Sequence, residues 1–330
     1  MKRWNVILGV DVSKLTLDVS SAFRGIHLQI NNNRQGFAVF MKWCKNHRLD
    51  LQSTLVVMEH TGGYEHQFCQ FCESINVDYL RVSGLEIKNS MGIVRGKTDK
   101  DDSYRISKYG EKRMDELIPS PRLNQYILDI KQLLSFRKRL VRENAGLKAS
   151  VKERKHMYQS KKEDAIAIIS ASKIKANKKH LLCIERELTR LVMADEAILK
   201  NYRILTSIKG IGPVNAWMAI AYTENFTSFT DGRKYAVYAG VVPFKTRSGT
   251  SIKKKDRVSN IANKELKQEL NQAAKTAMQH DPEIKAYATR KLEKKPYPLV
   301  LNNVKFKLIL RMFSLVKRKE KYVEEYLRSA

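Results

Sequence analysis

The sequence lacks any long apolar run. A membrane-spanning helix needs about 18 or more consecutive apolar residues, and none of its 330 residues belongs to such a run. The first residues, MKRWNVILGVDVSK, also lack the apolar core and the small-residue cleavage site of a secretory signal. These absences argue against a membrane or secreted protein and predict a cytoplasmic one.

Cysteine is scarce as well. The four cysteines, Cys44, Cys69, Cys72 and Cys183, are too few for a disulfide framework in a chain of this length. Cys69 and Cys72 form a lone CxxC just after His66, but a structural zinc site needs four ligands and no second pair stands at a useful spacing. Buried thiols on a helix face are the favoured interpretation, with zinc as the alternative.

Acidic residues are few relative to basic ones. The chain has 62 Lys and Arg against 34 Asp and Glu, a net charge of +28, while 43% hydrophobic residues indicate a globular protein. Such an excess favours a polyanionic partner, because binding to phosphates releases counterions. Nucleic acid is the favoured partner, and an anionic membrane surface is the rival.

The first third has the pattern of an α/β domain. Apolar and alternating runs predict strands over 5–12, 15–22, 25–32, 53–60 and 77–82, and helical spacing predicts helices over 35–47, 64–74, 85–94 and 99–109. This βββαβαβα order is the order of ribonuclease-H-like folds. Order alone is modest evidence, since many α/β domains begin similarly.

The character changes after Pro119 and Pro121. Apolar residues recur every three or four positions over about 123–141 and 181–198, separated by a Lys- and Ser-rich stretch over 152–179. We predict two long helices that form a coiled-coil-like hairpin or dimerisation arm, or else part of an ordinary helical bundle. The remainder predicts a glycine hairpin, a basic Gly/Ser loop, and helices over 264–280 and 299–328. The resulting domains are 1–120, 121–201 and 202–330.

Four carboxylates in the first third suggest a metal site. Asp11 lies within an apolar strand and Glu59 ends another, while Asp99 and Asp102 share one face at a helix start. An ionised carboxylate in an apolar strand is costly unless a cation or several donors compensate it. Hard oxygen ligands suit Mg²⁺ or Mn²⁺, which can activate a nucleophile and stabilise a leaving oxygen at a phosphodiester.

The acids also have ordinary explanations. Any one of them could be ion-paired or could cap a helix, and for Asp99 taken alone capping is the favoured interpretation. Asp18, Asp101 and Glu65 are expected to be solvated.

The segments GVDVSK, VVMEHTGGY and KTDKDD together resemble the DEDD transposases of bacterial insertion sequences, the group that includes the Piv DNA invertase. The resemblance implies a RuvC-like (ribonuclease-H-like) domain with Asp11, Glu59, Asp99 and Asp102 as its metal-binding acids. Ser103 follows the last of these acids where the family usually has Ala, a departure that does not affect the acids.

The segment LTSIKGIGPVNAWMAIAYTE is typical of a helix-hairpin-helix. Gly210 and Gly212 would let backbone N–H groups approach a phosphate, and Pro213 would open the second helix. A plain αα-hairpin turn is the alternative.

The later part of the chain resembles the C-terminal domain of the same family. The segment Ala239-Gly240-Val241-Val242-Pro243 is followed by Ser248-Gly249, and six Lys or Arg lie between Lys245 and Arg257. The resemblance implies that Ser248 is a nucleophile that forms a phosphoserine link to DNA; Ser251 is the competing candidate. The chain departs from the family at Lys267, where Arg is usual, so a cation is kept without its bidentate fork.

The sequence therefore predicts a transposase or recombinase, bacterial and nucleoid-associated, that acts on donor and target DNA. The resemblance further implies a homo-oligomer, from dimer to tetramer, a site composed from two subunits, and an element-encoded structured guide RNA. Expected nucleic-acid-binding residues are Lys97, Lys209, Gly210, Gly212, Lys245, Arg247, Lys253, Lys254, Lys255 and Arg257.

Three alternatives remain open at this point. A metal-only RuvC-like nuclease, such as a junction resolvase, would need the four acids but no serine. A kinase of the actin/Hsp70/sugar-kinase class would explain GVDVSK as a phosphate loop, although no second phosphate motif is evident. A DNA-binding protein with a degenerate catalytic domain would keep the hairpin alone.

Overall fold

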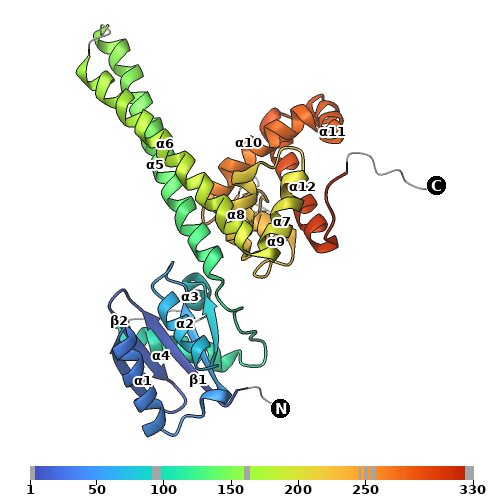
Figure 1. The fold of residues 1–330 in the computed structure, drawn as a ribbon. Helices are drawn as coiled ribbons and strands as arrows, with labels where there is room; N and C mark the ends of the chain where they lie inside the picture. The colour runs from blue at the N-terminus through green and yellow to red at the C-terminus, as the bar shows by residue number, and fades with distance from the viewer. Residues whose placement is uncertain are drawn as a thin grey trace, which may run out of the picture. The chain divides into compact units, whose positions relative to one another are not determined.

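The computed structural model describes residues 4–90, 98–159, 164–244, 247–248, 252–253 and 258–323. The chain divides into two compact units, Met1–Leu123 and Asn124–Ala330. The first is α/β and the second is almost entirely helical (Figure 1). Within the described ranges, no helix has the length and apolar character needed to cross a membrane.

The first unit is built on one mixed sheet. Strands β1 (Val6–Val12), β2 (Thr16–Ser21), β3 (Ile26–Asn31), β4 (Thr54–Glu59) and β5 (Asp78–Val82) lie in the order β3-β2-β1-β4-β5. β1 runs antiparallel to β2 and parallel to β4, and β4 runs parallel to β5. The helices are α1 (Arg34–Asn46), α2 (His66–Ser74), α3 (Gly84–Ser90) and α4 (Asp99–Lys112). The predicted order of strands and helices is confirmed, and it fits a ribonuclease-H-like fold.

Helices cover both faces of this sheet because successive strand residues point to opposite sides. On one side, Val10 and Met58 belong to a core shared with Phe40 of α1 and Phe68 of α2. On the other side, the core contains Ile7, Leu55 and Val57 of the strands together with Ile87 of α3 and Ile106 and Tyr109 of α4.

The cysteines of the first unit are buried thiols, as predicted. Cys44, Cys69 and Cys72 lie in the core beneath α1 and α2, and burial raises the pKa of the Cys44 and Cys69 thiols to about 12. A thiol with so high a pKa stays protonated at neutral pH and is a poor metal ligand. Cys183, in the second unit, is exposed.

Helix α4 approaches β1 unusually closely. A Cβ added to Gly9 would lie 2.1 Å from the backbone N of Ser107 and 2.3 Å from the backbone O of Ser103. Ser107 also donates to the carbonyl oxygen of Ile7, and the hydroxyls of Ser20 and Ser103 lie 2.7 Å apart. These contacts fix how α4 lies along the strand.

The second unit begins with a long antiparallel hairpin of α5 (Gln125–Tyr158) and α6 (Ala165–Ala194), which lie side by side (Figure 1). The prediction of a Lys-rich connection between the two helices over 152–179 was wrong, because both helices continue through most of that stretch. Buried Asn144 and Asn177 bond to each other across the hairpin at 3.0 Å. Such a polar pair in an apolar seam favours one register, since a slip would leave both amides unpaired.

The remaining helices form a bundle that contacts this hairpin mainly through α7 and α8. They are α7 (Glu196–Ser207), α8 (Pro213–Thr223), α9 (Gly232–Tyr238), α10 (Lys264–His280), α11 (Pro282–Leu292) and α12 (Tyr297–Arg318). One core joins them to residues of α5 and α6 such as Ile130 and Leu188. The further division of this unit at 201/202 stays a prediction.

Two helix predictions in this unit have clear outcomes. The bounds of α10 are confirmed. The final helix, predicted over 299–328, instead ends at Arg318, because Lys319 adopts a left-handed φ of 60° and its N–H bonds back to the helix. Helices α9 and α11 were not predicted; both are short, which leaves little room for a periodic pattern.

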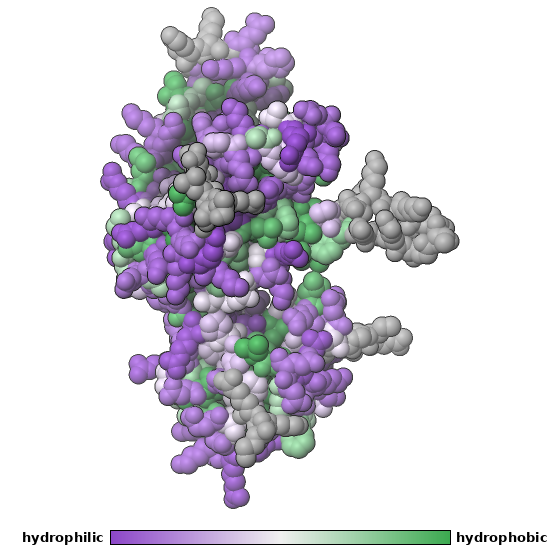
Figure 2. All heavy atoms as spheres, turned by 90° about the vertical axis from the view of Figure 1, so that its right-hand side faces the viewer, coloured by the Kyte–Doolittle hydropathy of each residue, from purple (hydrophilic) through white to green (hydrophobic). Residues whose placement is uncertain are grey.

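The face of the molecule shown in Figure 2 is mainly hydrophilic, with smaller apolar areas between the polar side chains. Large exposed apolar residues gather near the far end of the α5–α6 hairpin, at Met157, Tyr158, Ile166, Ile168 and Ile169.

Replacing Gly9 with Ala should destabilise the first unit. The added methyl meets backbone atoms of α4 that cannot move independently, so we expect a loss of about 1–3 kcal/mol in the free energy of unfolding. Urea denaturation measures it. Gly146→Ala is the control, because its Cβ would meet nothing within 4 Å on helix α5 and should stabilise by up to about 1 kcal/mol. Equal stability of Gly9→Ala and the wild type would contradict the close approach.

Candidate active site

Asp11 and Glu59 lie at neighbouring strand ends. The parallel register pairs Val10 of β1 with Met58 of β4, so the next residues, Asp11 and Glu59, follow side by side. Val10 and Met58 face the α1–α2 core, and strand alternation therefore turns both acids toward the α4 side. The predicted meeting of these two strand ends is confirmed.

The other two predicted acids stand on the first turns of α4. Ser103 and Ser107 lie over Gly9, and Gly110, farther along the helix, lies against Ile7 and Val57. The helix thus runs opposite to β1, and its N-terminal end lies toward the strand end that carries Asp11. Asp99 is exposed and Asp102 is half-buried, with Oδ1 of Asp102 2.8 Å from Nη1 of Arg105.

The cap of α4 differs from the expectation for Asp99. Thr98 is the N-cap: its hydroxyl accepts from the backbone N–H of Asp101 and lies 2.7 Å from the Asp101 carboxylate. The capping interpretation of Asp99 was therefore wrong, whereas Asp101 is exposed as expected and also contacts Thr98. Because Thr98 already caps the helix, the carboxylate of Asp99 is not used for that purpose.

Asp11 carries the electrostatic signature of this site. Burial, the largest cause, and the negative charges of Asp102, Asp99, Glu59 and Asp18 together raise its pKa from 3.8 to about 6. All three of the other predicted acids therefore lie near enough to Asp11 to disfavour its ionised form. The sequence-based grouping of these four residues agrees with the electrostatics.

Asp18 is an acid of this site that sequence reasoning missed. It pairs with Asp11 across the β1–β2 ladder and is buried rather than solvated, so the expectation for it was wrong. Its carboxylate lies 2.9 Å from Nε2 of His27 and accepts from the amide of Gln29 at 3.0 Å. The hairpin register of the first two strands would have indicated this pairing.

Glu59 rests against the start of α3. A Cβ built on Gly84 would lie 2.0 Å from Oε1 of Glu59, so a side chain at Gly84 would occupy the place of the carboxylate. Gly84 therefore helps to fix where Glu59 points, and the sequence offered no signal for it.

The donor set fits a hard divalent ion. Carboxylate oxygens are what Mg²⁺ and Mn²⁺ prefer, and Mg²⁺ typically uses one or two carboxylates while keeping several waters. In the described part of the chain, however, no three His, Cys, Asp or Glu side chains lie close enough together to form a ready-made metal cage. The negative charges of the other acids act on Asp11, but the carboxylates of the described residues do not converge on one point.

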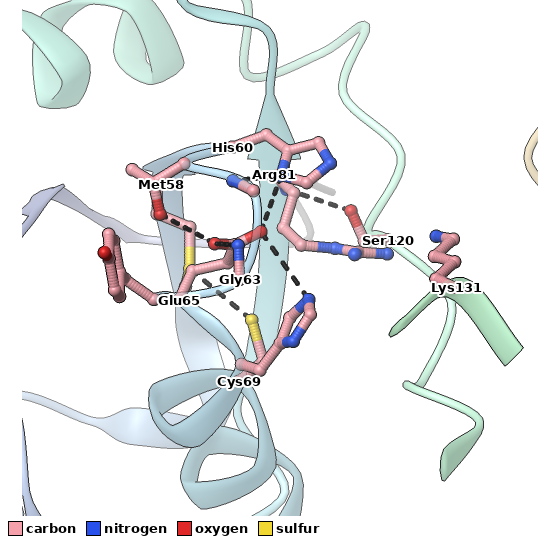
Figure 3. A network of polar contacts seen from close by, with 12 residues as sticks. Met58, His60, Gly63, Glu65, Cys69, Arg81, Ser120 and Lys131 are labelled. Atoms are coloured by element: carbon pink, nitrogen blue, oxygen red, sulfur yellow. Dashed lines mark hydrogen bonds and ion pairs between the residues drawn. The ribbon is translucent and has the colours of Figure 1, made fainter. Parts of the chain in front are cut away.

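The turn after Glu59 is held by a buried carboxylate. Glu65 is fully buried, and it accepts from the Thr61 hydroxyl and the Gly63 N–H while His60 Nδ1 lies 2.6 Å away (Figure 3). Burial alone would raise the pKa of Glu65, but the hydrogen bonds from His60 and Thr61 outweigh it and hold the pKa well below its usual range. The expectation that Glu65 is solvated was wrong.

Ser248 belongs to the second unit. It lies in strand β6 (Arg247–Ser248), which pairs with β7 (Ile252–Lys253), so that Ser248 is opposite Ile252 and Arg247 is opposite Lys253. The predicted Gly/Ser loop thus contains a short antiparallel ribbon. The predicted residues Lys97, Lys245, Ser251, Lys254, Lys255 and Arg257 lie outside the described residues.

The glycine hairpin contributes to a groove of about 550 Å³ between the α7–α8 turn and α10. Lys209, Gly210 and Gly212 all line it, and Gly212 is the N-cap of α8 with Pro213 in its first turn, as predicted. Gly210 has a structural requirement of its own: its φ is 93°, and a Cβ would lie 2.5 Å from the backbone O of Ala273.

Comparisons with known proteins match both units. A family model described as "Transposase" matches residues 8–157, and one described as "Transposase IS116/IS110/IS902 family" matches residues 202–289. The first range contains the four acids and the second contains Ser248. The chain is 25% identical over 276 residues to the pilin gene-inverting protein of Moraxella lacunata, with 80% of each chain covered, and 24% identical over 274 residues to that of Moraxella bovis.

Asp11→Asn should stabilise the metal-free protein at neutral pH. The folded pKa of about 6 exceeds the ordinary 3.8, so between about pH 4 and pH 6 the folded state binds more protons than the unfolded state. The free energy of unfolding therefore falls as the pH rises through that window. Asn cannot ionise, so we expect a gain of about 1–2 kcal/mol at pH 7.5 after allowing for solvent screening. The gain should vanish below about pH 4.

Thermal unfolding with chelator present, followed across pH, measures this difference. Asp115→Asn, which removes an exposed acid of the same unit, is the control and should show no such pH-dependent gain. A destabilised Asp11→Asn protein at pH 7.5 would contradict the like-charge crowding.

Gly84→Ala should weaken metal binding without unfolding the protein. The new methyl displaces the flexible end of Glu59 rather than backbone, so the fold tolerates it while the carboxylate turns away. We expect Mn²⁺ affinity to fall by about tenfold or more, as for other residues that orient ligands. Calorimetric titration measures it, and in a Glu59→Gln background the same substitution should have no further effect.

Proposed function

Because the chain belongs to the IS116/IS110/IS902 family of transposases, we propose that it cleaves and rejoins DNA with a divalent metal held by Asp11, Glu59, Asp99 and Asp102 and with Ser248 as nucleophile. The observation that carries the metal part is the raised pKa of Asp11, to which burial and three neighbouring acids contribute. A site that crowds negative charge in this way is stabilised when a cation binds.

The ion would supply charge neutralisation at the scissile phosphate and its leaving oxygen. Residues around the four acids would hold these carboxylates in place for the ion. Thr98 caps α4 and so holds Asp99 and Asp102 at the helix start, Gly84 limits where Glu59 points, and Glu65 fixes the turn that follows Glu59.

The serine step is a transesterification. The Oγ of Ser248 forms a bond to phosphorus while the bond from phosphorus to one strand end breaks, and the serine proton passes to the leaving oxygen. Rejoining is the reverse reaction with a different strand end as the attacking hydroxyl, so the phosphodiester bond energy is conserved and no external energy source is needed. The basic residues between Lys245 and Arg257 support the proposal, because cations stabilise the charge that develops on the phosphate.

The relatives support strand exchange rather than simple cutting. The Moraxella proteins are named for inverting a pilin gene. Inversion, excision and insertion all require strands to be cut and rejoined to new partners. We propose that this chain excises and inserts its own element by the same chemistry.

An element-encoded guide RNA and a homo-oligomer complete the proposal. A net charge of +28 accommodates RNA as well as DNA. The exposed apolar residues at the far end of the α5–α6 hairpin, such as Ile168 and Ile169, support contact with another subunit, since exposed apolar patches mark interaction surfaces.

A metal-only nuclease is the second candidate, and one observation favours it. All four acids belong to the first unit, and Asp102, Asp99 and Glu59 contribute to the Asp11 pKa shift, so the acids form a group without Ser248 of the second unit. Such a nuclease would cut strands by water attack and would leave no protein–DNA adduct.

Ser248→Ala should abolish the covalent protein–DNA adduct, because Ala offers no oxygen to attack phosphorus. The measurement is a denaturing gel of the full chain with element-end DNA, its guide RNA and Mg²⁺. Ser251→Ala is the matched control, three residues along the same segment, and should retain the adduct. An adduct that persists in Ser248→Ala and is lost in Ser251→Ala would transfer the role to Ser251. Cutting without an adduct in the wild type would favour the metal-only nuclease.

A further inference from the structure

Helix α12 carries a buried lysine that takes no part in the proposed metal site or in the serine step. Lys305 is only 3% exposed, between the fully buried Val304 and Leu308. Within the described ranges it makes no hydrogen bond or ion pair. A buried ammonium group without a counter-ion is costly, and lysine is almost never fully buried unless it is paired.

A second lysine makes the arrangement costlier. Burial, the larger cause, and the positive charge of Lys267 on α10 together lower the pKa of Lys305 to about 8. Lys267 is half-buried, and it too lacks an ion pair with the described residues. Two lysines thus lie close together, and among the described residues no acid forms an ion pair with either of them.

These lysines lie where the segment that carries Ser248, residues 241–258, joins the helical core. We call this junction the foot of the Ser248 segment. A Cβ built on Gly240, just after α9, would lie 2.7 Å from Cβ of Ala262, 3.2 Å from Cγ1 of Val258 and 3.7 Å from Cδ of Lys267. The chain therefore leaves the helical core and returns to it at the same place, and Lys267 is beside that place.

Helix α12 is tied to the same point. The side-chain amide of Asn302, one turn before Lys305, donates to the carbonyl oxygen of Val241 at 2.6 Å. The backbone N–H of Asn263, which caps α10, donates to the carbonyl oxygen of Tyr238 at 2.8 Å. Helices α9, α10 and α12 thus converge where the Ser248 segment is anchored.

We propose that Lys267 and Lys305 form an anion site that binds a phosphate group of DNA at the foot of the Ser248 segment. A phosphate between the two ammonium groups offsets both their desolvation and their mutual repulsion, and lysine binds phosphate as a point charge. The choice of DNA rests on the proposed function, in which the Ser248 segment meets a DNA strand.

The first test is thermal unfolding of the full chain with inorganic phosphate as the probe and with sodium chloride at matched ionic strength as the reference. Phosphate should raise the Tm of the wild type and should have no specific effect on Lys305→Met. Without phosphate, Lys305→Met should itself raise the Tm by about 2–4 °C, because it removes an unpaired buried charge. Lys317→Met, at an exposed position of the same helix, is the matched control and should respond to phosphate like the wild type.

Two results would overturn the site. A lower Tm for Lys305→Met would mean that the ammonium group serves the fold, and a phosphate response unchanged in Lys305→Met would mean that the anion binds elsewhere. Lys267→Gln, at a less buried position, provides a second variant and should also lose the phosphate response. Lys305→Arg keeps the charge and should retain part of it.

The second test measures the DNA adduct. Lys305→Met should slow adduct formation by about tenfold or more, the effect of losing one charged contact, while Lys317→Met should leave the rate unchanged. Normal adduct formation with weakened RNA binding would overturn the assignment to DNA. Normal adduct formation and phosphate response in Lys305→Met, beside a Ser248→Ala protein without adduct, would overturn this site but leave the proposed function. If Lys305→Met loses the phosphate response while Ser248→Ala still forms the adduct, the anion site would stand and the proposed function would be overturned.

Discussion

Helix α4 can carry two of the four acids to Asp11 only because Gly9 lets its backbone approach β1. With a side chain at that position the helix would have to move outward, and the acids of its first turns would move with it. The serines on its contact face, Ser103 and Ser107, complete the approach by bonding to the neighbouring strands. The strand order sets where Asp11 and Glu59 lie, and this single contact sets where the other two acids lie relative to them.

Each unit holds a buried charge next to another charge of the same sign, negative in the first unit and positive in the second. In the first, Asp18 and Glu65 are buried acids whose donors satisfy them, whereas Asp11 is surrounded by further negative charge. In the second, Lys305 is a buried cation whose pKa is lowered by burial and by the positive charge of Lys267. Natural proteins commonly tolerate such local destabilisation at sites where a ligand later supplies the missing charge. In the proposals made above, the acids bind a cation and the lysines bind an anion, which are the two charged partners of phosphodiester chemistry.

Much of the first unit could be predicted from its sequence because its strands alternate cleanly and its helices have distinct apolar faces. The meeting of Asp11 and Glu59 followed from two apolar strands that end in an acid. The capping of α4 by Thr98 was missed because Thr98 and Asp99 are both good capping residues and the sequence does not decide between them. The sequence predicts that Asp18 and Glu65 are solvated, because their partners, His27 and Thr61, are identified only by register and turn geometry.

The second unit was harder to predict for a physical reason. Lysine is a good helix former, so a Lys-rich stretch does not mark the end of a helix, and α5 and α6 continue through it. The role of Gly84 and the place of Lys305 depend on contacts between elements far apart in the chain, for which local periodicity carries no information. The roles of the four acids and of Ser248 remain predictions, supported by grouping and resemblance.

The shared anchor of the Ser248 segment at Gly240 has a consequence for how such proteins diversify. A segment that leaves and rejoins a core at one place is a closed loop, and the entropy cost of closing a loop grows only slowly with its length. Insertions or exchanges between Val242 and Val258 therefore leave the packing of α9, α10 and α12 intact. Under the proposed function, selection could lengthen, shorten or recharge this segment to suit new DNA ends while the helical framework stays the same.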